Sequence, residues 1–136
     1  MLFGKVLCKF GVGSAKIDLV LKGDTYSIGD MIKGEYIING GVVEQRLKRV
    51  ESDLVQTTSD DDREIVIHTN TIFSSAVILA QEKKVMGFSF KLPSSLQPSD
   101  HRVSYKFITR LVFTDGISSV DHDEIIIQPD LSIAKR

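Results

Sequence analysis

Residues 83–93 read K-K-V-M-G-F-S-F-K-L-P, and this stretch decides the fold class. Apolar side chains fall on every second position, and small or polar residues fall between them; the apolar set is Met86, Phe88, Phe90 and Leu92. Period-2 alternation is typical of a strand with one buried face. Pro93 ends the strand because proline lacks the N–H that a sheet ladder needs. We therefore expect other strands of the chain to pack against this apolar face.

The same alternation recurs along the chain. It predicts further strands over residues 15–22, 31–38, 63–73, 101–113 and 118–128, with Gly, Asp and Pro turns between them. Within 63–73 it places Ile65, Ile67 and Phe73 on one face, and Val66 and His68 on the other. Seven to eight short strands of this kind indicate an all-β fold, an antiparallel β-sandwich.

Residues 42–57 fit two structures. Apolar residues recur at helical spacing, but the stretch also fits a strand with a β-bulge at Lys48-Arg49. The preceding Asn39-Gly40-Gly41 is a strong hairpin signal. We therefore predict a strand here, joined to strand 31–38 by a tight hairpin.

Length and pattern suggest how the chain is organised. A chain of 136 residues fits one domain. We expect a short amphipathic helix over residues 1–13, the β-sandwich over 14–130, and a tail or linker over 131–136. Lys5 and Lys9 form the polar face of that helix, but two lysines are few for membrane binding. Packing of the helix on its own domain is the favoured interpretation.

Composition excludes several classes of protein. With 17 basic and 18 acidic residues the chain has no basic excess for a nucleic-acid surface. The single cysteine, Cys8, cannot form an internal disulfide, which fits a reducing, cytoplasmic location. No apolar run is long enough to span a bilayer.

Motifs for catalysis are missing from the sequence, so we predict no catalytic residue and no cofactor. There is neither a phosphate-binding P-loop nor a G-x-S-x-G nucleophile elbow. The D-H-D-E run at 121–124 offers Asp121, Asp123 and Glu124 as candidate ligands for a hard cation such as calcium. Short acidic runs are more often solvated turns, so the sequence does not predict a metal site there.

Several longer motifs together resemble one family. They are Y-S-I-G-D-M-I-K-G-E-Y-I-I-N-G-G at 26–41, V-V-E-Q-R-L at 42–47, E-K-K-V-M-G-F-S-F-K-L-P at 82–93 and V-D-H-D-E-I-I-I-Q-P at 120–129. This order of motifs resembles the SpoOM family of sporulation-control proteins from spore-forming bacteria. The resemblance implies an arrestin-like fold. Because familiar members are about twice as long and carry a second arrestin-like half, the resemblance leaves two possibilities. Either this chain is the isolated N-terminal arrestin-like domain, with 131–136 as a tail or a linker to a missing second domain, or it is a short relative of the family.

The resemblance further implies a non-enzymatic regulator of sporulation, with a link to cell division. Such a protein would act as a scaffold for protein partners, whose identity the sequence does not give. Exposed sheet edges could hold these partners or a second copy of the chain. Two alternatives stay open: a calcium- or sugar-binding sandwich that uses Asp115, Asp121, Asp123 and Glu124, and a membrane-edge adaptor that uses the N-terminal helix.

Overall fold

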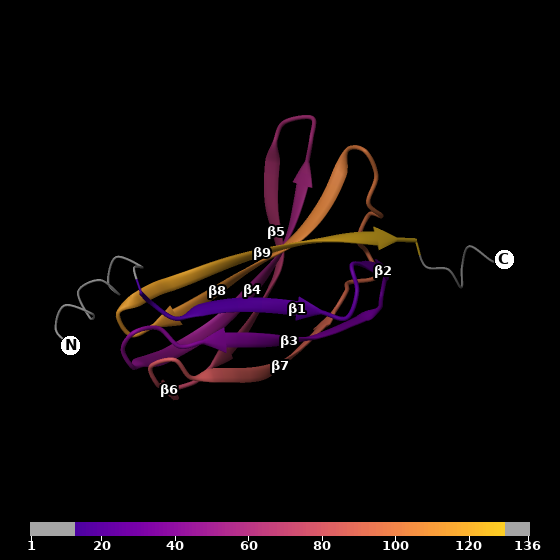
Figure 1. Cartoon of the computed structure of the whole chain (residues 1–136). Coiled ribbons are helices and arrows are strands. Elements are labelled where there is room, and N and C mark those ends of the chain that lie inside the picture. The colour runs from indigo at the N-terminus through magenta and orange to yellow at the C-terminus, as the bar shows by residue number, and fades with distance from the viewer. Residues whose placement is uncertain (1–12, 130–136) are drawn as a thin grey trace.

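The computed structural model describes residues 13–129, which form two facing β-sheets (Figure 1). Within that range there are nine strands and no helix. The strands are β1 Lys16–Leu21, β2 Thr25–Ser27, β3 Met31–Asn39, β4 Gln45–Thr58, β5 Arg63–Phe73, β6 Val77–Ile78, β7 Lys83–Lys91, β8 Val103–Phe113 and β9 Gly116–Gln128.

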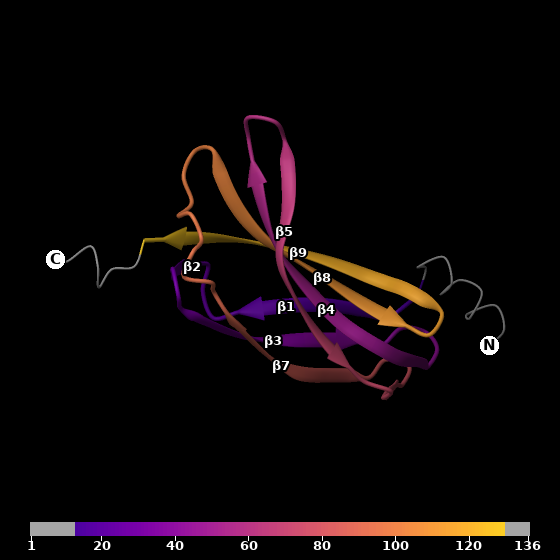
Figure 2. The same cartoon turned by 180° about the vertical axis from the view of Figure 1, so that it is seen from behind.

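The smaller sheet has the order β1-β3-β7, and the larger one has the order β2-β9-β8-β4-β5, with β6 paired to the start of β4. Every pair is antiparallel except β2 and β9, which run parallel. Figure 2 shows the two layers from behind, with the β4–β5 hairpin projecting beyond them. The predicted all-β sandwich is confirmed.

The core lies between the sheets, and residues 83–93 contribute three of its buried side chains. Phe88, Phe90 and Leu92 of that stretch are buried. The ring centroid of Phe90 lies 5.2 Å from that of Phe107 in the opposite sheet, and Tyr36 and Phe88 meet edge to face at 5.3 Å. Each such side chain stabilises the fold by about 1.5–3 kcal/mol through burial. The alternating pattern therefore identified the core face correctly.

A chain of hydroxyl groups crosses this core. The Tyr36 Oη lies 2.7 Å from Ser52 Oγ, which lies 2.8 Å from Thr109 Oγ1. Tyr36 belongs to the small sheet, whereas Ser52 and Thr109 are neighbours in the large one. Because buried hydroxyls are costly without partners, this chain links the two layers specifically.

The hairpin predicted at Asn39-Gly40-Gly41 is wrong. β3 and β4 belong to different sheets, so this segment is a crossover between layers. The glycines are there for close backbone approach: a Cβ on Gly40 would lie 2.2 Å from the Leu79 carbonyl oxygen, and one on Gly41 would lie 2.1 Å from that of Gly13. Glycine is required at these positions because neighbouring backbone approaches closely, and not because the chain forms a hairpin turn.

The strand prediction for 42–57 is confirmed from Gln45 onward, whereas residues 42–44 precede the strand. The bulge lies where the pattern placed it. Against β8, Leu47 pairs with Phe113 and Arg49 with Val112, so Lys48 is the extra residue. A second irregularity was not predicted. The register between β4 and β5 shifts after Leu54, because Ile67 of β5 is an extra residue without a partner in β4. Strict alternation of side chains between the two faces of β5 is therefore broken at Ile67. Val66 consequently shares a face with residues 69, 71 and 73, contrary to the alternation expected from the sequence.

The count of seven to eight strands was too low, because β2 lies where the sequence predicted only turns. Tyr26 is held there by a parallel pairing with Ile127, a long-range contact that local pattern does not reveal. The predicted helix over 1–13 and the tail over 131–136 lie outside the described residues, apart from Gly13 in a turn. No helix able to cross a membrane occurs in the part of the chain that the structure describes.

Candidate functional site

Three carboxylates meet where β9 passes the edge of β1. Asp18 comes from β1, and Asp121 and Asp123 come from β9; one oxygen of each lies within 4.8 Å of the others. Asp121 and Asp123 pair across the sheet with Thr109 and Phe107, so they point to the inner face. We call these three residues the acidic triad.

One member of the triad, Asp121, also helps to close the edge of the small sheet. The backbone N–H of Leu19 donates to Asp121 Oδ2 at 2.8 Å, and that of Ile17 donates to Ser119 Oγ at 3.2 Å. Side chains of β9 thus take the place of a neighbouring strand along β1. An edge satisfied in this way does not readily accept another strand.

Burial makes the triad electrostatically unusual. The pKa of Asp123 is raised to about 7. Desolvation by burial is the largest cause, and the neighbouring carboxyl groups of Asp121 and Asp18 add to it. Desolvation and the Asp121 carboxylate also raise the pKa of Asp18. Among the described residues, Asp123 Oδ2 is a buried side-chain oxygen without a hydrogen-bond partner. Near neutral pH the triad can therefore hold a proton or a cation between its oxygens.

A hollow of about 630 Å³ opens beside the triad. It is bounded by β1, by Gly23 and by β9. Four carboxylates line it and no cationic side chain does; they are Asp18, Asp24, Asp123 and Glu124. This lining suits a hard cation, for which carboxylate oxygens are the preferred ligands.

The structure brings together only part of the acidic set that the sequence singled out. Asp121 and Asp123 meet, but Glu124 follows on the other face of β9, opposite Lys106. Asp115 lies in the turn between β8 and β9, and residues 60–62 lie in the β4–β5 hairpin; none of these joins the triad. Asp18 was missed because only the tertiary fold brings it to residues more than a hundred positions away.

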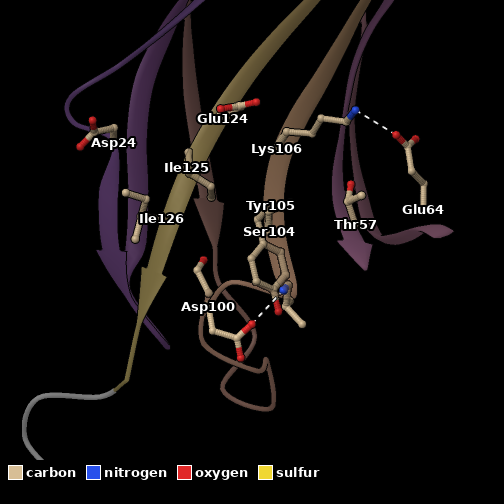
Figure 3. Close-up of a pocket in the computed structure, with 12 residues that line it drawn as sticks. Asp24, Thr57, Glu64, Asp100, Ser104, Tyr105, Lys106, Glu124, Ile125 and Ile126 are labelled. Atoms are coloured by element: carbon tan, nitrogen blue, oxygen red, sulfur yellow. Dashed lines mark hydrogen bonds and ion pairs between the residues drawn. The ribbon is translucent and has the colours of Figure 1, made fainter. Parts of the chain in front are cut away.

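Glu124 also borders a second hollow, of about 480 Å³, shown in Figure 3. There Lys106 Nζ forms an ion pair with Glu64 Oε1 at 3.0 Å. Asp100 accepts hydrogen bonds from the backbone N–H groups of Arg102 and Val103, which lower the pKa of that carboxyl. Lys106 and Glu64 are thus paired with each other across the larger sheet, and Asp100 holds the loop before β8 in place.

A third hollow has the opposite charge. It measures about 570 Å³ and lies where β5 ends, lined by Arg46, Lys48 and Phe73 together with Ser74, Ser75 and Thr114. Arg46 Nη1 donates to the Ser75 carbonyl oxygen at 2.9 Å. Within residues 13–129, neither Arg46 nor Lys48 forms an ion pair with a carboxylate. We call this the cationic hollow.

Comparison with known proteins gives a consistent family. A family model described as SpoOM protein matches residues 3–135. The sporulation-control protein Spo0M of Bacillus subtilis (strain 168) is 26% identical in an alignment 132 positions long, which covers 93% of this chain and 51% of that protein. The crystal structure of Spo0M from Bacillus subtilis superposes with a TM-score of 0.77, covering 86% of this chain and 50% of that chain.

A more distant structure shares the fold alone. A Niemann-Pick type C2 protein from the Japanese carpenter ant is 9% identical, with a TM-score of 0.58 over 85% of this chain and 93% of that one. The chain described here spans about half the length of the sporulation-control protein that it matches.

Proposed function

Because the chain belongs to the SpoOM protein family, we propose that it is a regulatory domain in the control of sporulation. The observation that carries this proposal is the match over 93% of the chain to a sporulation-control protein, together with a shared fold at a TM-score of 0.77. The sequence resemblance to this family is thereby confirmed. The domain acts in the cytoplasm, without catalysis, as an arrestin-like scaffold for other proteins.

The character of the surface supports action through protein contacts. Eleven large apolar side chains of the described residues are exposed, and they include Val85 and Val20 on the small sheet and Val120 and Ile126 on the large one. These exposed apolar side chains lie on both sheets, and a protein that contacted them would remove apolar surface from water.

Deletion of the gene in its source organism tests this proposal. We expect the number of heat-resistant spores to change in the deletion strain and to return to the parental value when the gene is restored. A restored copy carrying Val120→Asp and Ile126→Asp, both on the outer face of β9, should not rescue the strain if it stays folded and abundant. A deletion strain that sporulates like its parent would contradict the proposal.

The link to cell division is the finer part of the proposal. A fluorescent fusion of the protein, followed through growth and sporulation, should concentrate at division sites in part of the cell cycle. A signal that stays uniform in the cytoplasm at every stage would remove this link and leave the regulatory role intact.

Divalent-cation binding is a second candidate function, favoured by the unpartnered Asp123 Oδ2 at a hollow lined by four carboxylates. Melting of the protein above pH 7, with and without millimolar calcium, tests it. A binding site should raise the melting temperature, and Asp123→Asn should abolish the rise. Equal melting temperatures with and without calcium would dispose of this candidate.

A further inference from the structure

Phe73 is the most exposed of the large apolar side chains in residues 13–129, and it lies beside two cations. Its exposed fraction is 78%. It lines the cationic hollow with Arg46 and Lys48, which form no ion pair with any carboxylate of the described residues. Aromatic rings and arginine are enriched where proteins bind one another. The hollow thus combines apolar surface with charge that the domain itself does not neutralise.

Hydrogen bonds to the backbone hold the residues of the hollow in place. The Arg46 carbonyl oxygen accepts from the N–H of Thr114 at 3.1 Å, and the Lys48 carbonyl oxygen accepts from the N–H of Ser74 at 3.3 Å. The Arg46 side chain in turn donates to the Ser75 carbonyl oxygen. Because these groups are already ordered, little binding free energy would be lost in immobilising them.

Neighbouring cations of β4 and β8 are neutralised within the domain. Arg49 Nε lies 3.1 Å from Glu51 Oε2, and Arg110 forms ion pairs with Glu51 at 2.8 Å and with Asp53 at 2.5 Å. Both carboxylates are therefore engaged away from the hollow, whose lining contains none. An acidic group from outside the domain would supply the charge complement that the hollow lacks.

The form of the hollow favours a segment of a protein over other anionic ligands. Arg46, Lys48 and Phe73 are all exposed, so the hollow does not enclose a small molecule as most small-molecule sites do. Nucleic acids are bound through many phosphates, whereas this hollow offers two cations on a chain with a net charge of -1. A partner protein can use the hollow as one point of a larger interface.

We propose that the cationic hollow binds an acidic segment of a partner protein, with carboxylates at alternate positions followed by an apolar residue. Arg46 and Lys48 are exposed on either side of the buried Leu47. Their Cα atoms therefore lie about 7 Å apart, which is the spacing of alternate residues in an extended segment. The apolar residue packs on Phe73, which lies beside Lys48 because the N–H of Ser74 donates to the Lys48 carbonyl oxygen.

The lining offers further donors to these carboxylates. Arginine holds a carboxylate through parallel N–H groups, and this geometry is more specific than attraction between point charges. The hydroxyl groups of Ser75 and Thr114 also line the hollow, and each can donate to a carboxylate oxygen. The inference deepens the proposed function and rests on it only in taking protein contacts as the mode of action.

Titration of the full chain with short peptides, followed through the amide signals in NMR, tests the site. The probe is the peptide G-E-S-E-L-G with both ends blocked. One control peptide has glutamine in place of both glutamates, and the other has serine in place of leucine. We expect saturable shifts centred on residues 46–48, 73–75 and 114. Each control peptide should bind about fivefold more weakly, because exposed ion pairs and one apolar contact each contribute modestly.

Variants of the hollow test the role of each side chain. Arg46→Glu combined with Lys48→Glu should abolish binding of the probe and create binding of the basic peptide G-K-S-K-L-G. Phe73→Ala should remove the preference for leucine over serine and keep the preference for glutamate over glutamine. Lys33→Glu combined with Lys91→Glu reverses two exposed charges of the small sheet, and this control should bind the probe like the original chain. Melting temperatures check that all variants are folded.

Three results would overturn the inference. They are a probe that causes no shifts at millimolar concentration, equal binding of the glutamate and glutamine peptides, and inorganic phosphate that binds as tightly as the probe. The last result would show a site for adventitious anions only. The readout here is peptide binding, whereas that of the proposed function is spore number, so either can fail while the other holds.

Discussion

Asp123 shows how one residue can make the stability of this fold depend on pH. Its pKa of about 7 lies far above the value of an exposed aspartate, because burial and two neighbouring carboxylates oppose its charge. The folded state therefore holds a proton that the unfolded chain releases. This contribution to stability is complete at acidic pH and is lost as pH rises from about 4 to about 7.

Asp123→Asn should remove this pH dependence, because an amide stays neutral throughout. Relative to the original protein, the free energy of unfolding of the variant should rise by about 1 kcal/mol between about pH 5 and about pH 8, allowing for solvent screening at this half-buried site. Urea unfolding of both proteins at the two pH values measures it. A difference between the proteins that does not change with pH would contradict the account of the triad.

Ser52 is a second residue with a calculable effect, since it stands between Tyr36 and Thr109 in the buried hydroxyl chain. Ser52→Ala should lower the free energy of unfolding by about 1–3 kcal/mol, because two buried hydroxyls lose their shared partner. Tyr36→Phe should cost only about 1 kcal/mol, because Ser52 and Thr109 still bond to each other.

Denaturant unfolding compares these two variants with Ser104→Ala, a change at an exposed position of β8. That control should be close to neutral. The account of the hydroxyl chain would fail if Ser52→Ala were as mild as the control.

At the scale of elements, the crossover between the sheets is the most constrained segment. Gly41→Ala would place a Cβ 2.1 Å from the Gly13 carbonyl oxygen, which is backbone and cannot rotate away. We expect a loss of about 2–3 kcal/mol in the free energy of unfolding. Gly87→Ala in β7 is the matched control, because nothing lies within 4 Å of its Cβ position.

The control should be neutral or stabilising by up to about 1 kcal/mol, since alanine loses less entropy than glycine in a strand. Thermal and urea unfolding of both variants give the comparison. Equal stabilities of the two alanine variants would show that the close approach at the crossover does not constrain it.

The sequence pattern predicted correctly those strands whose buried face follows from alternating apolar residues within the strand itself. The burial of Phe88 and Phe90 and the bulge at Lys48 followed from local spacing alone. Features that depend on pairing with distant segments could not be predicted from local spacing. β2 exists because it pairs with β9, and the β5 shift exists because of its register with β4.

The candidate site was predictable only in part for the same reason. Asp121 and Asp123 belong to one acidic run, but Asp18 reaches them through the contact of β1 with β9. The cationic hollow likewise joins Arg46 and Lys48 of β4 to Phe73 at the end of β5. Nothing in the local sequence indicated that these two charges would lie beside an exposed aromatic ring.

For the whole molecule, the proposed function predicts that this domain can do the regulatory work of the corresponding half of its longer relative. It covers 51% of that sporulation-control protein and shares its fold. A domain that works through exposed sheet surfaces should be transferable as a unit, because its core carries the fold and its faces carry the contacts.

The most direct measurement is the count of heat-resistant spores in Bacillus subtilis when this chain replaces the matching half of Spo0M. The strain lacking Spo0M and the strain with the native protein set the two limits. We predict that the chimaera brings the count most of the way to that of the native strain. A chimaera that is folded and abundant, yet gives the same count as the deletion strain, would contradict the claim that this domain is a regulator of sporulation.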